Sequence, residues 1–396
     1  MRQALAAPVY NYPNKRSRIL NLRQPARQVV RLVYREGFLA FLLLLLLILS
    51  LWNPSEVRHY GAYVHWKTLG TLLGLLAVTT ALQQSGYFPV LARRMLQRLR
   101  TERGLALGLV LLTAGLSTFL TNDISLFVVV PLTLSFEGAG DFHLLGRLVV
   151  FEAIAANVGS TLTPIGNPQN LFLWHHGSLS FGAFCLAMAP LVLLLTAVLL
   201  GFVWWAFPGE RLSPHALQAP EAAPDRPLFL GSALLLIGFV LLVDRGFPMV
   251  ADLLVLGIYL IWRPQVLCRM DWALLVLFAV IFVDFHLLAT LPGFSAWVHG
   301  WGWGDPGRVY GYTALLSQVW SNVPTAVFAT KFTSHWLPIA YGVNVGGNGL
   351  VWASLANLIA LRLARRRGLV GLFHRWAVPY FGITLALGYL LLAGVG

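Results

Sequence analysis

One apolar segment of the chain is interrupted by residues that a membrane-spanning helix tolerates poorly. Apolar residues dominate positions 148–156 and 171–174, and between them Asn157 to Leu171 reads NVGSTLTPIGNPQNL. Two prolines and two glycines oppose a continuous helix here, because proline removes a backbone donor and glycine weakens the helix. Irregular backbone inside a bilayer is tolerated only where it is buried in protein or lines a polar cavity. The run therefore predicts a discontinuous helix whose two half-helix ends face a ligand or an ion.

The chain contains this pattern a second time. Asn344 to Leu358 reads NVGGNGLVWASLANL, in which Asn-Val-Gly and Asn-Leu recur at the same spacing as in the first run. Upstream of the two runs, residues 116–122 read LSTFLTN and residues 316–322 read LSQVWSN. Further back, Trp66 and Trp272 each open an apolar span. These matches occur in the same order and predict a duplicated architecture.

Composition places the chain among polytopic membrane proteins. Of its 396 residues, 58% are hydrophobic and 11% are charged, and the mean hydropathy is +0.72. A soluble domain with one apolar helix does not reach these values. The formal net charge of +13 is better explained by basic cytoplasmic loops than by a nucleic-acid partner. We therefore expect contact with membrane lipid and none with nucleic acid.

The expected fold is an all-α polytopic membrane protein with about nine spans and two re-entrant hairpins. A basic N-terminal segment (1–37) precedes a first membrane repeat (38–207), a linker rich in Pro, Ala and charge (208–227) and a second membrane repeat (228–396). Residues 292–308 are rich in Gly and Trp and are expected to form an interfacial loop. The expected spans cover residues 38–52, 64–86, 146–173, 181–206, 228–243, 248–262, 271–291, 335–361 and 377–395.

Two further apolar segments carry a polar tip. One is residues 104–136 around Thr121-Asn122-Asp123, and the other is residues 309–331 around Ser321-Asn322-Val323. The arms of the first are about 17 and 13 residues long, too short at about 1.5 Å per residue to cross a hydrocarbon core of about 30 Å comfortably. We therefore expect re-entrant hairpins. Two short ordinary spans are the alternative for residues 104–136.

The distribution of basic residues predicts the orientation. With the N-terminus in the cytoplasm, the segments assigned to the cytoplasm hold most of the 28 Lys and Arg residues, as the positive-inside rule requires. The first hairpin then enters from the cytoplasm and the second from outside, so the two repeats are inverted. We expect an integral protein of a bacterial inner (plasma) membrane. The basic residues left outside or in the hairpins are Arg58, Lys67, Arg245, Arg308 and Lys331.

Candidate binding residues lie at the hairpin tips and in the interrupted runs. Their hydroxyl and amide groups, with loop carbonyls, offer the oxygen ligands that hard cations prefer. Half-helix N-termini there carry partial positive charge and suit an anion. The alternative is structural, since Ser, Thr and Asn also cap helices. The candidates are Thr121, Asn122, Asp123, Asn157, Gly159, Ser160, Thr161, Asn167, Asn170, Ser321, Asn322, Thr325, Asn344, Gly346, Gly347, Asn348 and Asn357.

Asp123 is the sharpest single candidate, because a carboxylate at membrane depth is costly and usually functional. It fits a cation ligand or a proton carrier, and the alternative is an N-cap for the helix over 124–136. Glu152, Asp284 and His286 also lie in apolar segments. Each of these three fits a proton path or one half of a buried pair.

Other motifs are weak or missing. His175 and His176 are adjacent, so they do not share a helix face, and we interpret them as solvated interface residues rather than a metal pair. No nucleotide-binding, zinc-protease or nucleophile-elbow motif is present. An intramembrane enzyme or a regulatory membrane receptor is the alternative class. Neither needs two inverted copies, so we expect a transporter without enzymatic activity and without a cofactor.

The two tips and the first interrupted run resemble the ion transporter superfamily, from about residue 60 to the end of the chain. That group includes arsenite permeases, citrate transporters, divalent-anion symporters and one class of sodium/proton antiporter. The resemblance implies inverted repeats, a central substrate with flanking cation sites, and an elevator-like motion in a homodimer. It implies a first cation region at Thr121, Asn122, Asp123, Asn157 and Gly159, with Na⁺ held by the first four, and a second at Ser321, Asn322, Asn344 and Gly346.

The expected function is secondary active transport of a small anion of the carboxylate or oxyanion class, coupled to Na⁺ or H⁺ at the hairpin tips. Val323 stands where the first tip has Asp123, so the second cation site is expected to be weaker than the first. Two alternatives remain within transport. One is a cation/proton antiporter that uses Asp123, and the other is an arsenite-type efflux permease.

Overall fold

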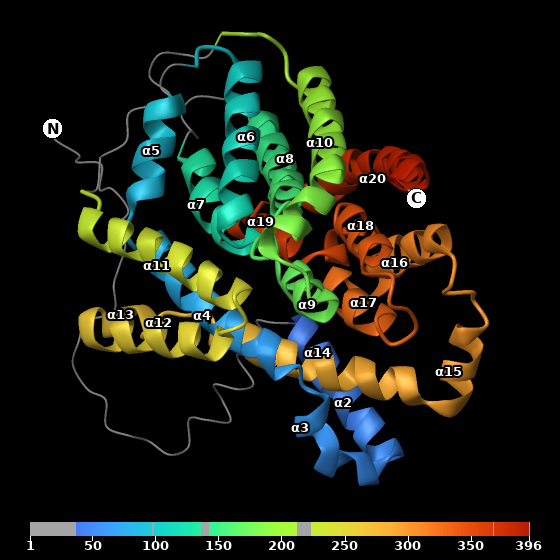
Figure 1. The fold of residues 1–396 in the computed structure, drawn as a ribbon. Coiled ribbons are helices and arrows are strands. Elements are labelled where there is room, and N and C mark those ends of the chain that lie inside the picture. Colours follow the sequence, from blue (N-terminus) through green and yellow to red (C-terminus); the bar gives the residue numbers. More distant parts are fainter. Residues whose placement is uncertain (1–36, 97–98, 136–141, 212–222, 367, 396) are drawn as a thin grey trace, which may run out of the picture.

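The computed structural model describes residues 37–96, 99–135, 142–211, 223–366 and 368–395, and these residues fold mainly into helices (Figure 1). The basic segment expected at 1–37 lies outside the described residues except for Gly37, as does the centre of the expected linker. An isolated bridge joins Thr101 to Arg211. The helical fold expected from the composition is therefore confirmed for the described part of the chain.

In the first half, the two spans expected before the hairpin at 38–52 and 64–86 correspond to α2 and α4, and the shorter elements η1, α3 and α5 lie around them. The hairpin itself consists of α6 and α7, which meet at the predicted tip, and the interrupted run separates α8 from α9. The elements are α2 (Gly37–Trp52), η1 (Pro54–His59), α3 (Tyr60–Tyr63), α4 (Trp66–Gln84), α5 (Tyr87–Leu96), α6 (Glu102–Phe119), α7 (Asn122–Leu134), α8 (Phe142–Ser160), α9 (Pro168–Gly177) and α10 (Phe181–Ala206).

The second half repeats the order of tip and break, after the helices α11, α12 and α14 at the three expected spans and the shorter helices α13 and α15. Here α16 and α17 meet at the second predicted tip, and the second interrupted run separates α18 from α19. The elements are α11 (Arg226–Asp244), α12 (Pro248–Trp262), α13 (Pro264–Cys268), α14 (Trp272–Thr290), α15 (Pro292–His299), α16 (Pro306–Trp320), α17 (Asn322–Ala329), α18 (Trp336–Gly346), η3 (Val351–Ala353), α19 (Leu355–Ala364) and α20 (Leu369–Val395).

Helix packing also matches between the halves. Helix α6 packs on α8 and α7, and α16 packs correspondingly on α18 and α17. Helix α10 contacts α8 as α20 contacts α18, and α10 and α20 contact each other. Outside this group, α12 packs on α4 and α2 packs on α14, so each half supplies a helix that covers the other. Figure 1 shows α4, α11 and α12 side by side, apart from α6, α8 and α10.

Within the described residues, five helices are long and apolar enough to cross a membrane, or six if α2 is joined to the segment Pro54–Tyr63, which is bent from it by 117°. Helix α6 is among the five, with 18 residues, so the expectation that neither hairpin arm reaches spanning length is wrong for this arm. Two other boundaries also differ. Residues 292–308 contain the helix α15, and the last helix begins at Leu369 rather than near 377.

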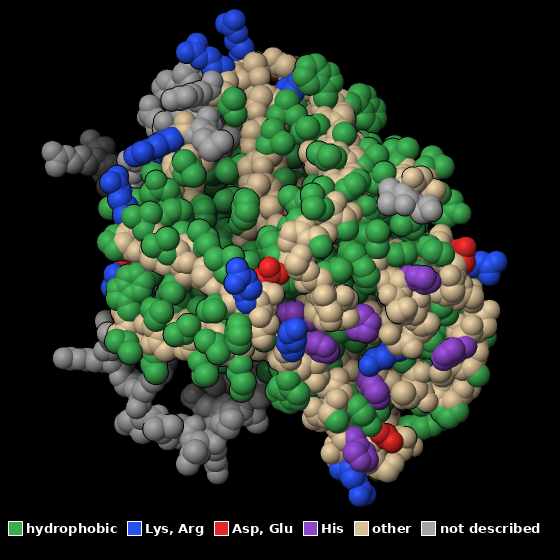
Figure 2. All heavy atoms as spheres, in the orientation of Figure 1, with side chains coloured by type: hydrophobic (Ala, Val, Ile, Leu, Met, Phe, Trp, Pro, Cys, Tyr) green, Lys and Arg blue, Asp and Glu red, His purple; other side chains and the backbone are tan. Residues whose placement is uncertain are grey.

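The outer surfaces of α10, α11 and α12 are strongly apolar. Leu186, Leu193, Leu234, Leu253 and Ile261 are each at least two-thirds exposed, and Figure 2 shows apolar side chains over much of the visible surface. Large contiguous apolar surface is unstable in water and suits contact with lipid tails. Polar side chains are instead buried inside, around the two interrupted runs.

Helices α6 and α8 approach so closely at Gly159 that a side chain does not fit. A Cβ atom at this position would overlap the backbone carbonyl of Ala114. In the second half, a Cβ at Gly346 would lie 2.8 Å from the carbonyl oxygen of Ala314. Gly115, one residue from Ala114, has open space around it instead.

We expect Gly159→Ala to lower the free energy of unfolding by about 1–3 kcal/mol, because α6 and α8 must separate to admit the methyl group. Gly115→Ala is the matched control on the same helix pair. It should be neutral or slightly stabilising, since alanine is the better helix former. Thermal unfolding of the detergent-solubilised protein measures both. Equal unfolding temperatures for the two variants would contradict the close approach seen here.

Candidate functional site

Four helix N-termini meet around one small cavity. Its lining includes Asn122 and Asp123 at the start of α7, and Pro168 and Gln169 at the start of α9. The second half contributes Asn322 and Val323 at the start of α17, and Ser354 and Leu355 at the start of α19. The two hairpin tips and the second half of each interrupted run therefore converge on one point.

This convergence creates a positive potential without any basic side chain. The first backbone N–H groups of a helix lack intrahelical partners, and the aligned peptide dipoles place about half a positive charge at each N-terminus. Here four such ends face one cavity, whose lining contains no Lys or Arg. Anions bind readily at helix N-termini. The arrangement therefore suits an anion of modest charge.

Asp123 lines this cavity and two larger ones. The cavity between the tips has a volume of only about 10 Å³, which is close to the space that one water molecule needs. Asp123 also lines a cavity of about 60 Å³ together with Arg362, and one of about 250 Å³ together with Arg269. Asp271 lines both of these. The carboxylate of Asp123 is therefore shared by all three of these cavities.

Asp123 does not cap helix α7. The N-cap position belongs to Thr121, helix α7 begins at Asn122, and α7 has no side-chain cap hydrogen bond. The backbone N–H of Asp123 donates to Asn122 Oδ1 (3.0 Å). Its own Oδ1 is buried and has no hydrogen-bond partner among the described residues. The capping alternative is thus wrong for this position, and the carboxylate retains an acceptor that a cation or proton can satisfy.

The first tip is bonded to the first interrupted run. Asn122 donates from its backbone N–H to the carbonyl of Gly166 (2.9 Å) and from Nδ2 to Asn157 Oδ1 (3.3 Å). Thr118, just before the tip, donates to the carbonyl of Gly159 (3.1 Å) and accepts from Thr163 Oγ1 at its own carbonyl (2.6 Å). The approach of Asn122 to Asn157 is as expected from the sequence.

The second tip is bonded to the second run through different side chains. Gln318 Nε2 donates to the carbonyl of Gly346 (2.7 Å), and Gln318 Oε1 accepts from the N–H of Leu350 (2.7 Å). Ser321 Oγ donates to the carbonyl of Ala353 (3.2 Å). Ser321 has φ +74°, a backbone conformation that L-residues rarely adopt. Such strain costs about 1–3 kcal/mol and persists only where surrounding contacts hold it.

Buried asparagines join the two interrupted runs to each other. Asn157 Nδ2 donates to Asn357 Oδ1 (2.9 Å), and Asn157 Oδ1 accepts from Ser354 Oγ (3.0 Å). The equivalent asparagine of the second run, Asn344, makes the equivalent bonds to the first run. Asn344 Nδ2 donates to Asn170 Oδ1 (2.7 Å), and Asn344 Oδ1 accepts from Asn167 Nδ2 (3.0 Å).

Further bonds inside each run repeat the correspondence. Asn170 Nδ2 contacts the carbonyls of Ser160 and Thr163, both at 3.3 Å. Asn357 Nδ2 contacts the carbonyls of Gly347 (2.9 Å) and Leu350 (3.4 Å), which occupy the same positions in the second run. The asparagines of both runs therefore hold the two breaks together and satisfy the irregular backbone, and they do not line the cavity.

The sequence candidates thus fall into two groups. Asn122, Asp123 and Asn322 line the cavity between the tips, and Thr121 lines the larger cavity beside it. The remaining candidates make contacts within and between the breaks or tips: Asn157, Gly159, Ser160, Thr161, Asn167, Asn170, Ser321, Thr325, Asn344, Gly346, Gly347, Asn348 and Asn357. Asn348 Oδ1 is buried without a partner among the described residues.

Four contributing residues were not among the candidates. Gln169 and Ser354 line the cavity, and Thr118 and Gln318 tie each tip to its break. Thr118 and Gln318 each stand three residues before the Thr or Ser of their tip. This spacing can be seen in the sequence. Because one residue is a threonine and the other a glutamine, however, the sequence does not indicate that they have the same role.

The other ionisable candidates lie away from the cavity. Glu152 is buried and accepts a hydrogen bond from Thr133. Asp284 is buried in α14, and neither of its carboxylate oxygens has a partner among the described residues. The interpretation of His175 as solvated is wrong, because its exposed fraction is 8% and its Nδ1 lies 3.1 Å from Thr68 Oγ1. His176 is exposed, as expected.

The fold and the site define a class. Apolar helices surround two interrupted helices, and the ends of four helices meet at a small polar cavity, as in membrane transporters built on discontinuous helices.

Comparison with known proteins agrees with this class. A family model described as "Citrate transporter" matches residues 33–336. The inner membrane protein YbiR of Escherichia coli is 39% identical over 367 residues, covering 92% of this chain and 97% of that protein. An uncharacterized transporter of Methanocaldococcus jannaschii is 33% identical, covering 83% and 89%. A silicon efflux transporter of Oryza sativa is 27% identical, covering 75% and 79%.

The chain therefore belongs to the citrate transporter family, within the ion transporter superfamily to which its motifs are similar. It is an integral membrane protein.

Proposed function

We propose that this protein is a secondary active transporter that moves a small anion of the carboxylate or oxyanion class, coupled to Na⁺ or H⁺ at the hairpin tips. The observation that carries the proposal is the convergence of four helix N-termini on one cavity without a basic side chain. Helix ends attract an anion, yet without a paired cationic side chain they also let it leave. A transporter needs both properties.

Asp123 is the proposed coupling group. Its carboxylate lies beside the anion cavity and lines, with Asp271, the two larger cavities, which we propose as the route of the coupling ion. With Thr121 and Asn122 it offers carboxylate, hydroxyl and amide oxygens for Na⁺, or it accepts a proton alone. Asn157, which the resemblance adds to this set, instead holds the tip and the second break through its own hydrogen bonds. The second tip carries Val323 at this position, so we assign the coupling ion to the first tip.

The moving part is the unit made of both hairpins and both interrupted helices. The asparagine bonds between the runs favour movement of the two breaks as one body. Contacts of α19 with α7 and of α9 with α17 join the halves further. Helices α2, α4, α11, α12 and α14 form the static part in this proposal. The matching order and packing of the halves support two inverted repeats. We place the N-terminus in the cytoplasm. The contact between α10 and α20 then lies inside each protomer.

Uptake by the full chain in proteoliposomes tests the function. Labelled citrate is supplied outside, and inward Na⁺ or H⁺ gradients are imposed separately. We expect accumulation that requires one of these gradients and that other small carboxylates or oxyanions inhibit. A failure of every anion in a panel of citrate, malate, sulfate, phosphate and arsenite to move under either gradient would contradict the proposal.

Gln169→Glu tests whether the helix ends hold the anion. Gln169 is 2% exposed at the start of α9, and the isosteric carboxylate would repel an anion in the cavity. We expect anion affinity to fall by about tenfold or more, which corresponds to about 1.4 kcal/mol. Gln169→Met is the matched control, since it keeps the length without the charge and should change affinity much less. Equal anion affinity in the two variants would show that this cavity does not bind the anion.

A further inference from the structure

Six basic side chains from four segments gather where α4 begins and where α9 and α14 end. We call them the histidine–lysine cluster, and Figure 2 shows several histidines and basic side chains (Lys or Arg) close together in the region where Figure 1 places α9 and α14. Their segments are distant in sequence but packed together, since α4 contacts both α9 and α14. The members are His65 and Lys67 at the start of α4, His175 and His176 in α9, His286 in α14 and Lys331 after α17.

Hydrogen bonds and ring contacts hold the histidines in place. Thr68 Oγ1 lies 2.8 Å from His65 Nδ1 and 3.1 Å from His175 Nδ1, and the two rings are nearly parallel at 6.4 Å. The ring of Phe172 contacts His65 at 5.6 Å and His176 at 5.8 Å. Two histidines therefore contact the ring of Phe172, and the third, His175, is held by Thr68 and the ring of His65.

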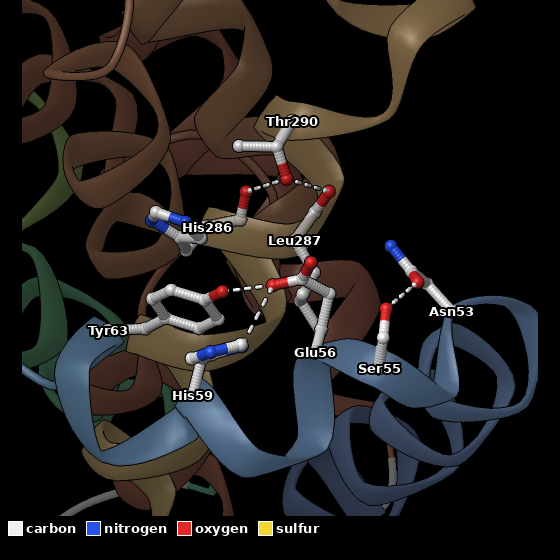
Figure 3. Close-up of polar contacts among 8 residues, drawn as sticks. All are labelled: Asn53, Ser55, Glu56, His59, Tyr63, His286, Leu287 and Thr290. Atoms are coloured by element: carbon white, nitrogen blue, oxygen red, sulfur yellow. Dashed lines mark hydrogen bonds and ion pairs between the residues drawn. The ribbon is translucent and has the colours of Figure 1, made fainter.

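The fourth histidine pairs with a lysine. His286 Nδ1 lies 3.3 Å from Lys331 Nζ, so the ammonium donates to a neutral imidazole. The other side of this ring stacks on Tyr63 at 3.9 Å. Figure 3 shows that Tyr63 in turn points at Glu56, to which it donates a hydrogen bond. If His286 becomes protonated, it stands beside Lys331 as a second positive charge.

Negative charge near the cluster is scarce. Glu56 lies close enough to attract a charged His286, but Tyr63 and His59 already contact it. No carboxylate in the described part of the chain lies within ion-pair distance of Lys67 or Lys331. Other titratable groups lie on the elements that pack against the cluster. Asp252 of α12 lies against Gly70 and Gly74 of α4, one to two turns beyond Lys67. The others include Asp284, buried in α14, His299 in α15 and His335 before α18.

Mutual repulsion within the cluster has a measurable consequence. Lys67, Lys331 and the neighbouring imidazole of His176 oppose the charging of His65. A bound anion would offset this repulsion between positive charges and favour the protonated histidines. Binding of the anion would therefore take up protons. By linkage, affinity for the anion must then rise as pH falls through the range in which the histidines titrate.

We propose that the histidine–lysine cluster is a second anion-binding site, for a small multivalent oxyanion or carboxylate, which binds more tightly as pH falls. This second site rests on the proposed function in one respect. In the proposed topology the cluster faces the outside of the membrane, so the site would bind the anion before it is transported. Clefts lined by one sign of charge raise the local concentration of the opposite ion.

The test is sulfate binding to the detergent-solubilised full chain by titration calorimetry at pH 6 and at pH 8. Sulfate keeps the same charge at both values, so any change in affinity comes from the protein. The measurements use the Gln169→Glu background, which disables the cavity between the tips. We expect binding about tenfold tighter at the lower pH, because the bound anion favours protonated histidines and the lower pH supplies the protons that binding takes up.

Removal of two exposed members, one histidine and one lysine, shows whether the cluster itself binds the sulfate. The double variant His176→Gln, Lys331→Gln should lose the gain in affinity at low pH. The control double variant His299→Gln, Arg308→Gln removes one exposed histidine and one exposed basic residue outside the cluster and should keep it. Sulfate binding without pH dependence, or unchanged binding in the cluster variant, would overturn the proposal. Loss of transport with binding intact would count against the proposed function alone.

Discussion

Asp123→Asn is expected to lower gradient-driven accumulation of the anion by more than about tenfold. The protein should remain folded and inserted in the membrane. The substitution keeps the size and the hydrogen-bonding ability of the side chain and removes only its charge. Asp123 lines all three cavities and has a buried, unpartnered oxygen, so this charge is available for a coupling ion. Uptake in proteoliposomes under Na⁺ or H⁺ gradients measures the effect. Exchange of anion without a gradient should survive better than accumulation.

Asp271→Asn is the matched control for this change. Asp271 lines two of the same cavities, and its carboxylate caps α14 by accepting from the N–H of Leu274 (3.2 Å). Asparagine caps about as well as aspartate, so this variant loses a charge near the route and keeps its structural role. It should retain ion-dependent uptake. If Asp123→Asn shows the ion dependence and uptake of the wild type at equal expression, Asp123 is not the coupling group.

The elements that the sequence predicted best are those whose chemistry conflicts with a membrane. Prolines and glycines in an apolar segment are compatible with few structures, so the breaks after α8 and α18 were predictable. The polar tips were predictable for the same reason, and α7 and α17 begin at Asn122 and Asn322 as the tips indicated. The equal order of tip and break in both halves followed directly from the repeated motifs.

Other features depend on packing that a linear sequence does not reveal. Asn157 pairs with Asn357, and Asn344 pairs with Asn170, so each bond joins residues of different halves. The motifs alone suggested that these side chains contact a ligand, but they are hydrogen-bonded within the protein. Helix α20 begins at Leu369, ahead of Arg375, because Phe373 and Ala377 are buried while Arg375 is exposed. Charge alone therefore placed this boundary too late. His175 is buried because α4 covers the end of α9.

The asparagine network also accounts for how a carrier can keep broken helices inside a membrane. Each break frees backbone carbonyls that lipid cannot satisfy, and each unpaired buried group costs about 1–3 kcal/mol. Asn170 and Asn357 satisfy these carbonyls within their own runs and accept from Asn344 and Asn157 of the other run. The same side chains therefore stabilise each break and fix its position relative to the other. The helix N-termini at the cavity stay aligned as a result.

Asn344→Ala is accordingly expected to destabilise the protein by several kcal/mol, at about 1–3 kcal/mol for each buried partner left unpaired. Asn344 is 2% exposed, and its removal leaves Asn170 Oδ1 without its donor and Asn167 Nδ2 without one acceptor. A double-mutant cycle of Asn344→Ala with Asn170→Ala should give a coupling energy of about 0.5–3 kcal/mol. The corresponding cycle of Asn157→Ala with Asn357→Ala should give a similar value, because the two bonds occupy matching positions.

A cycle of Asn344→Ala with Asn357→Ala is the matched control. No hydrogen bond joins these two side chains among those of the described residues, although both belong to the second run. Its coupling energy should therefore be clearly smaller than that of either bonded pair. Denaturant unfolding in mixed micelles provides all three values. Coupling of equal size in the bonded and unbonded pairs would mean that the runs are held by packing alone, and the two breaks would then be free to move separately during transport.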